Sequence, residues 1–114
     1  MRIINKTNSF VVAEEATIAN TPFKRMKGLL GRKELKEGQA LVLDPCNSIH
    51  TFFMRFPIDI LFLDKNNKII KTISCLKPFR LTAIYFNAAL AIELPSGKIQ
   101  SLSIHKGDNL SLES

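Results

Sequence analysis

The segment SIHTFFMRFPIDILFLD, residues 48–64, carries His50, Arg55 and Asp59 inside an otherwise apolar run. An imidazole, a guanidinium and a carboxylate can together hold an anionic or hydroxylated molecule, or exchange protons with it. We therefore predict that these three side chains line a shared hollow and are not scattered over the surface.

Pro57 is the residue expected to bring them together. In a straight strand Arg55 and Asp59 would share a face but lie about 13 Å apart, at roughly 3.3 Å per residue, too far to pair. A proline often marks a bulge, which would shorten that distance or turn Asp59 toward the face of His50. The structural alternative is that Arg55 pairs with Asp59 or Glu93 on a solvated face while His50 binds backbone groups.

Enzymatic chemistry is the second possibility for the same residues. Cys46 could act as a nucleophile with His50 as its base, and Asp59 or Glu93 could serve as general acid or base. The sequence shows no oxyanion loop, phosphate-binding loop or dinucleotide fingerprint. We therefore assign no catalytic residue and no cofactor.

The cysteines and histidines have the number needed for a four-coordinate zinc ion but not the spacing. No CxxC or HxxxH pair occurs, and Cys46 with His50 forms a single CxxxH. We expect no metal site and reduced thiols, with Cys75 in the core; a bridge between Cys46 and Cys75 stays open if their strands pair.

Length and charge bound the remaining possibilities. The 114 residues predict a single domain, 1–114, and the formal net charge of +6 suits an anionic partner. Six of the sixteen basic residues lie between Lys24 and Lys36, but aromatic residues are not interleaved with them, so a solvated helix face is favoured over nucleic-acid binding. Because no apolar run could span a bilayer or act as a signal peptide, we expect a cytoplasmic protein.

One helix and many short strands must position these residues. In NTPFKRMKGLLGR, Asn20 or Thr21 can cap a helix that begins at Pro22, repeats apolar residues at Phe23, Met26 and Leu30, contains Gly28 and ends at Gly31. Strands are expected near 3–6, 10–13, 17–19, 40–43, 49–63 with a break at the proline, 68–75, 88–94, 98–104 and 109–113. The pattern predicts a mainly β fold, α+β by strict count: a small antiparallel β-barrel or sandwich with one N-terminal helix.

Four segments, RMKGLLGR, IHTFFMRFPIDILFLD, AIELPSG and KGDNL, resemble the successive motifs of the domain of unknown function 192 family, also called uncharacterised protein family 0127. The resemblance spans about residues 20–110 and implies a compact, mostly β domain, without an accepted activity, cofactor or substrate. The characteristic positions correspond to Arg25, Gly28, Leu29, His50, Phe52, Met54, Pro57, Asp59, Glu93, Leu94, Gly97, Gly107 and Asp108.

The favoured hypothesis is a non-enzymatic module that binds a small ligand or a protein through a polar pocket. The ligand would be anionic or sugar-like, because arginine and carboxylates beside aromatic rings suit such molecules. The alternatives are a hydrolase-like enzyme using His50 with Asp59 or Cys46, and nucleic-acid binding through the basic helix. The residues expected to line the pocket are Arg25, His50, Phe52, Met54, Arg55, Asp59 and Glu93.

Overall fold

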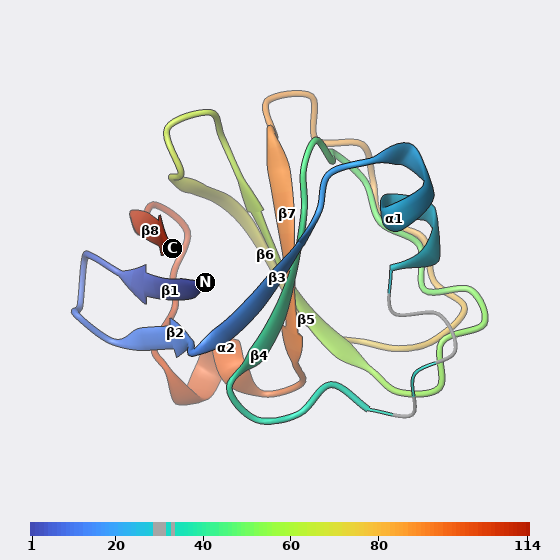
Figure 1. Ribbon diagram of the computed structural model, residues 1–114, viewed down its shortest axis with the longest axis horizontal. Helices are drawn as coiled ribbons and strands as arrows, with labels where there is room; N and C mark the ends of the chain where they lie inside the picture. The colour runs from blue at the N-terminus through green and yellow to red at the C-terminus, as the bar shows by residue number, and fades with distance from the viewer. Residues whose placement is uncertain (29–31, 33) are drawn as a thin grey trace.

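A five-stranded sheet forms the centre of the computed structural model, which describes residues 1–28, 32 and 34–114 (Figure 1). Its strand order is β3 (Glu15–Ala19), β4 (Gln39–Leu43), β7 (Leu90–Pro95), β5 (Ile58–Leu63) and β6 (Ile69–Leu76). β3 and β4 run parallel, and the other neighbours are antiparallel. β7 is therefore the central strand, paired on both edges.

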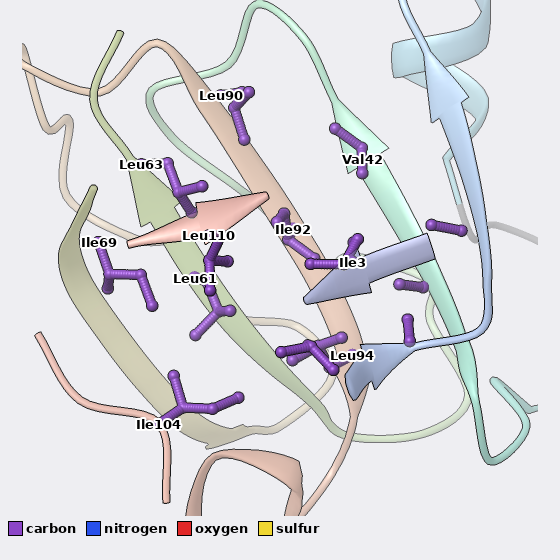
Figure 2. Packing of buried hydrophobic residues seen from close by; sticks show 14 of the residues in the cluster. Ile3, Val42, Leu61, Leu63, Ile69, Leu90, Ile92, Leu94, Ile104 and Leu110 are labelled. Atoms are coloured by element: carbon purple, nitrogen blue, oxygen red, sulfur yellow. The ribbon is translucent and has the colours of Figure 1, made fainter. Parts of the chain in front are cut away.

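A three-stranded sheet covers one face of the large sheet. Its order is β2 (Val11–Ala13), β1 (Arg2–Asn5) and β8 (Leu110–Glu113), so the first strand pairs with the last. Ile3 and Leu110 of this sheet point toward Leu61 and Ile92 of the large one (Figure 2). The two sheets thus enclose an apolar core.

The two faces of the large sheet bury different side chains, as a period of two requires. On β5, Leu61 and Leu63 join the core beneath the small sheet, while Ile60 and Phe62 belong to a second cluster on the opposite face. On β7, Ile92 likewise faces the small sheet. The spacing of side chains in the sequence predicts this alternation, with Leu61 opposite Phe62 and Ile92 opposite Glu93, and the structure confirms it for both strands.

The N-terminal helix α1 (Pro22–Lys27) begins where the sequence predicts. The Thr21 side chain caps it by accepting a hydrogen bond from the Lys24 amide, and Pro22 occupies the first turn. The helix ends at Gly28, whose φ of 46° lies in the left-handed region, so Gly28 is the C-cap and does not interrupt the helix from inside. The predicted terminator Gly31 and the apolar spacing of Phe23, Met26 and Leu30 fall outside the described backbone and side chains.

The mainly β prediction is confirmed, and the described strands form two packed sheets without closing into a barrel, as in the sandwich alternative. Three details are wrong. β3 and β4 pair in parallel, where antiparallel pairing was predicted. Residues 98–104 do not form a strand, because Lys98–Ser101 fold into the short helix α2. Residues 49–57 form a loop with one isolated bridge, between His50 and Leu81, so regular pairing starts only at Ile58.

Asp59 joins three elements beneath the small sheet. Its side chain is fully buried, and its two oxygens accept hydrogen bonds from the Cys75 amide in β6 and the Ile99 amide in α2, both at 2.8 Å. The β5–β6 register shifts here, which leaves the Cys75 amide free to turn toward the carboxylate. Gly97, the N-cap residue of α2, has no side chain that could accept from the first amides of the helix. The Asp59 carboxylate, from strand β5, accepts from one of them and so caps α2.

We predict that Asp59→Asn destabilises the fold by about 2–3 kcal/mol, because the amide retains one acceptor and leaves one buried backbone N–H unpaired. Urea unfolding measures this loss. Asp64→Asn is the matched control, since Asp64 also accepts from two backbone amides but lies in a half-exposed turn. Equal losses in the two variants would contradict the role assigned to Asp59.

Candidate functional site

A cavity of about 320 Å³ lies between helix α1, the loop that follows β4 and the central strand β7. We call it the α1 cavity. It lies on the face of the large sheet opposite the small sheet, where α1 packs in Figure 1. Its wall includes Arg25, Lys27, Cys46, Ser48, His50, Met54 and Glu93. Cations, a thiol and a carboxyl group therefore share one concave site.

Glu93 is the most deeply buried ionisable group of this cavity. It pairs through its backbone with Leu41 on β4 and Ile60 on β5, and its residue surface is only 5% exposed. Its Oε2 atom has no hydrogen-bond partner within the described part of the chain. Burial raises the pKa of Glu93 to about 8, against a smaller opposing effect of the Arg32 guanidinium. At neutral pH the group is therefore mainly a neutral carboxyl, able to donate and accept a hydrogen bond.

The positive charge of the α1 cavity comes from the last turn of α1. Arg25 is half-buried and Lys27 is exposed, and both line the cavity. A second hollow, lined by Lys24, Lys27 and Arg32, lies against the same helix. The basic segment thus borders two concave surfaces, where the sequence predicted only a solvated helix face.

Cys46 contributes a thiol to the α1 cavity. It is half-buried, and its Sγ lies 3.1 Å from the Ser48 carbonyl oxygen, to which it donates. Burial raises the pKa of Cys46 above its ordinary value, which keeps the group as a neutral thiol. A neutral thiol is a weak nucleophile, so this environment disfavours thiolate catalysis.

The structure brings together four of the seven predicted pocket residues. Arg25, His50, Met54 and Glu93 line the α1 cavity. Phe52 lies beside it, with its ring stacked on His50 at a centroid distance of 5.4 Å.

Arg55 and Asp59 do not line the α1 cavity. Arg55 is exposed, and no ion pair joins it to Asp59 or Glu93 in the described chain. The irregular loop ends at Pro57, and β5 begins at Ile58, so the loop does not change the alternation of side chains within β5. Asp59 therefore stays on the same face as Leu61 and Leu63. The prediction that Pro57 turns Asp59 toward His50 is wrong.

Thr51 positions His50 and was not singled out from the sequence. It is fully buried; its amide donates to the Arg80 carbonyl at 2.9 Å, and its Oγ1 donates to the Lys77 carbonyl and accepts from the Arg80 amide. These bonds join loop 50–57 to loop 77–88. The only sequence signal was that a hydroxyl sits next to the histidine and faces the other way.

The structure also tests the predictions about the cysteines, a metal site and a membrane span. Both thiols are free, and Cys75 is exposed at the β6 bulge, where the sequence predicted a core position. Among the described residues no group of three or more histidine, cysteine or acidic side chains could hold a metal ion. No described helix has the length and apolar character needed to cross a membrane.

Comparisons with known proteins agree on one family. The DUF192 family model, described as "Uncharacterized ACR", matches residues 3–112. A UPF0127 protein of Thermococcus sibiricus is 32% identical over 97% of this chain and 74% of its own length, and one of Pyrococcus furiosus is 31% identical over 95% of each chain.

A solved structure shares the fold. A protein of unknown function from Novosphingobium aromaticivorans superposes with a TM-score of 0.84, at 18% identity over 97% of this chain and 82% of that one. The motifs around Arg25, His50, Glu93 and Gly107 all fall inside the matched range. The chain belongs to the DUF192 family of uncharacterised proteins, whose curated relatives bear the name UPF0127.

Proposed function

We propose that the α1 cavity binds a compact anionic molecule that also carries a hydroxyl or carbonyl group. The observation that carries this proposal is the buried Oε2 atom of Glu93, which has no hydrogen-bond partner among the described residues. A buried polar atom without a partner costs about 1–3 kcal/mol, and a ligand group in the cavity would remove that cost.

Charge and protonation make an anion the best match. Arg25 and Lys27 provide cationic donors on one wall, and the His50 imidazole adds a further hydrogen-bonding group. An ionised Glu93 would repel an anion, but its raised pKa of about 8 keeps the carboxyl neutral at pH 7. The neutral group can then donate to a ligand oxygen while the cations hold the negative charge.

The cavity volume limits the ligand to a small molecule. About 320 Å³ lies at the lower end of the roughly 300–1,000 Å³ that small-molecule sites usually occupy. Sugar phosphates, hydroxycarboxylates and comparable molecules combine that size with both kinds of group. The chain would then act as a binding module without a reaction of its own.

A hydrolase-like enzyme is the alternative, now restricted to one residue pair. His50 and Asp59 lie on opposite sides of the large sheet, and both Asp59 oxygens are used by backbone amides. His50 and Cys46 do share the α1 cavity, so only this pair supports the alternative.

Binding of small anions is tested by calorimetry and thermal unfolding with glucose, glucose 6-phosphate, glycerol 3-phosphate, citrate and inorganic phosphate. We expect a hydroxylated anion to bind and raise the melting temperature, and glucose to bind at least tenfold more weakly because it lacks the charge. Failure of every anion in the set to bind would contradict the proposal.

Variants on the same helix localise the binding. Arg25→Ala should weaken binding of the responding anion at least tenfold, because a charge-assisted hydrogen bond contributes about 1.5–3 kcal/mol. Lys24→Ala is the matched control, since Lys24 lines the second hollow and not the α1 cavity. The reverse order of effects would place the anion in the second hollow.

The raised pKa of Glu93 predicts that the stability of the fold depends on pH. Its pKa rises from an ordinary value of 4.5 in the unfolded chain to about 8 in the folded protein. The stabilisation that this shift gives the folded state is therefore fully present below pH 4.5 and is lost as the pH rises to about 8. Glu93→Gln cannot ionise, so we expect the wild type to lose stability relative to this variant by up to about 1.4 kcal/mol per pH unit across that window. Urea unfolding at several pH values measures the difference, with exposed Glu15→Gln as control. Parallel pH profiles for wild type and Glu93→Gln would contradict it.

Alkylation distinguishes the enzymatic alternative. Iodoacetamide at neutral pH should label exposed Cys75 before half-buried Cys46, because burial keeps Cys46 a neutral thiol. Mass spectrometry of timed samples, with Cys75→Ser to isolate the Cys46 signal, gives the two rates. Faster labelling of Cys46 would indicate an activated nucleophile and favour catalysis over passive binding.

A further inference from the structure

Two loops beside the α1 cavity expose an unusual number of large apolar side chains. Six of the eight exposed large hydrophobic residues in the described chain lie in loops 50–57 and 77–88. Phe53 is 76% exposed, Leu81 is 69% exposed and Phe86 is 86% exposed. Exposed apolar patches of this kind mark surfaces that contact another apolar phase or partner. We call the part of this surface where the two loops meet the aromatic loop patch; its residues are Phe52, Phe53, Phe79 and Leu81.

The two loops meet at one end, where these four residues lie together. Phe53 and Phe79 contact each other edge to face, with ring centroids 5.8 Å apart. His50 and Leu81 form a β-bridge, and the buried Thr51 hydrogen-bonds to loop 77–88. Phe53 and Phe79 both adopt positive φ, 64° and 62°, a conformation that bulky residues rarely take. The backbone therefore holds these rings outward at a conformational cost that core packing does not repay.

The charges among these residues have a single sign. Loops 50–57 and 77–88 contain three charged residues, Arg55, Lys77 and Arg80, and no acidic one. All three are exposed. The basic helix α1 lies at the same end of the molecule (Figure 1). The patch thus combines apolar side chains with a cationic rim.

We infer that the aromatic loop patch docks on the surface of an anionic lipid bilayer. Phenylalanine and leucine side chains can enter the boundary between headgroups and acyl chains, while arginine and lysine remain at the phosphate level. Each cation near an anionic membrane strengthens binding by about 1 kcal/mol, or roughly fivefold. This mode attaches the chain to the surface and requires no membrane-spanning segment.

Charge and composition favour a bilayer over the other occupants. A second copy of the chain would bring Arg55, Lys77 and Arg80 against the same cations, and the net charge is already +6. Protein interfaces are enriched in tyrosine, tryptophan, phenylalanine, methionine and arginine, and they carry about one hydrogen bond per 100–200 Å². The apolar side chains of the patch are phenylalanine and leucine, which offer no hydrogen-bonding group, and the charges beside them are all positive. This combination suits a layer of lipid phosphates above acyl chains.

Co-sedimentation with vesicles tests the inference on the full chain. We expect binding to vesicles of phosphatidylcholine mixed with phosphatidylglycerol, at least tenfold weaker binding to phosphatidylcholine alone, and weakening as salt increases. Absence of binding to the mixed vesicles at low salt would overturn the inference. Equal binding to both vesicle types would also overturn it, because the cations would then contribute nothing.

Matched variants assign the binding to the patch. Phe53→Ser with Phe79→Ser should weaken binding to the mixed vesicles at least tenfold, since two neighbouring exposed rings lose their apolar contact. Phe10→Ser is the control, because Phe10 is 46% exposed but lies near the small sheet. Thermal unfolding verifies that both variants are folded. Equal binding of wild type and the double variant would overturn the inference.

The same preparations exclude the other occupants. Sedimentation velocity without lipid should show a monomer for the wild type and for the double variant. A wild-type dimer that the double variant abolishes would assign the patch to contacts between copies and overturn the inference. Glu93→Gln should bind the mixed vesicles as the wild type does, because the carboxyl lies inside the α1 cavity and not on the loops.

Discussion

The central position of β7 is the constraint on which the rest of the structure depends. A strand paired on both edges and covered on both faces buries the side chains that it carries, and in β7 all of them except the last, Pro95, are buried. Strict alternation decides which layer each side chain enters. Leu94 therefore joins the core beneath the small sheet, while its neighbour Glu93 enters the layer that contains α1. One carboxyl group is thereby held in an apolar layer, and the α1 cavity forms above it.

Two buried acidic residues of this fold, Asp59 and Glu93, show how surroundings separate a structural role from a functional one. Asp59 satisfies both oxygens with backbone amides and joins β5, β6 and α2. Glu93 has an oxygen without a partner in the described chain and faces a cavity. Both lie in the middle of apolar strands and belong to motifs of the family, so residue type and position do not distinguish them. What distinguishes them is whether each carboxyl oxygen has a hydrogen-bond partner.

Local signals predicted local structure well. The cap at Thr21, the alternation of Leu61 with Phe62 and the opposite facing of Ile92 and Glu93 all follow from nearest neighbours. The errors concern contacts between distant segments: Asp59 meets the Ile99 amide of α2, and the register shift in β6 exposes Cys75. Pro57 ends a loop and does not bend a strand, because residues 49–57 pair with loop 77–88 and not with a sheet neighbour. A single sequence does not specify such pairings.

The pairing of β1 with β8 has a consequence for synthesis of the chain. Asn5 pairs with Leu110, and the Asn5 side chain also donates through Nδ2 to the buried Asp108 carboxylate. On a translating ribosome β1 emerges first and waits for its partner until nearly the whole domain has been made. Contacts between such distant segments slow folding, and until they form, the face of Leu61, Ile92 and Leu94 is not fully covered. The nascent domain therefore passes through a stage in which a chaperone could bind the face that later becomes its best-packed core.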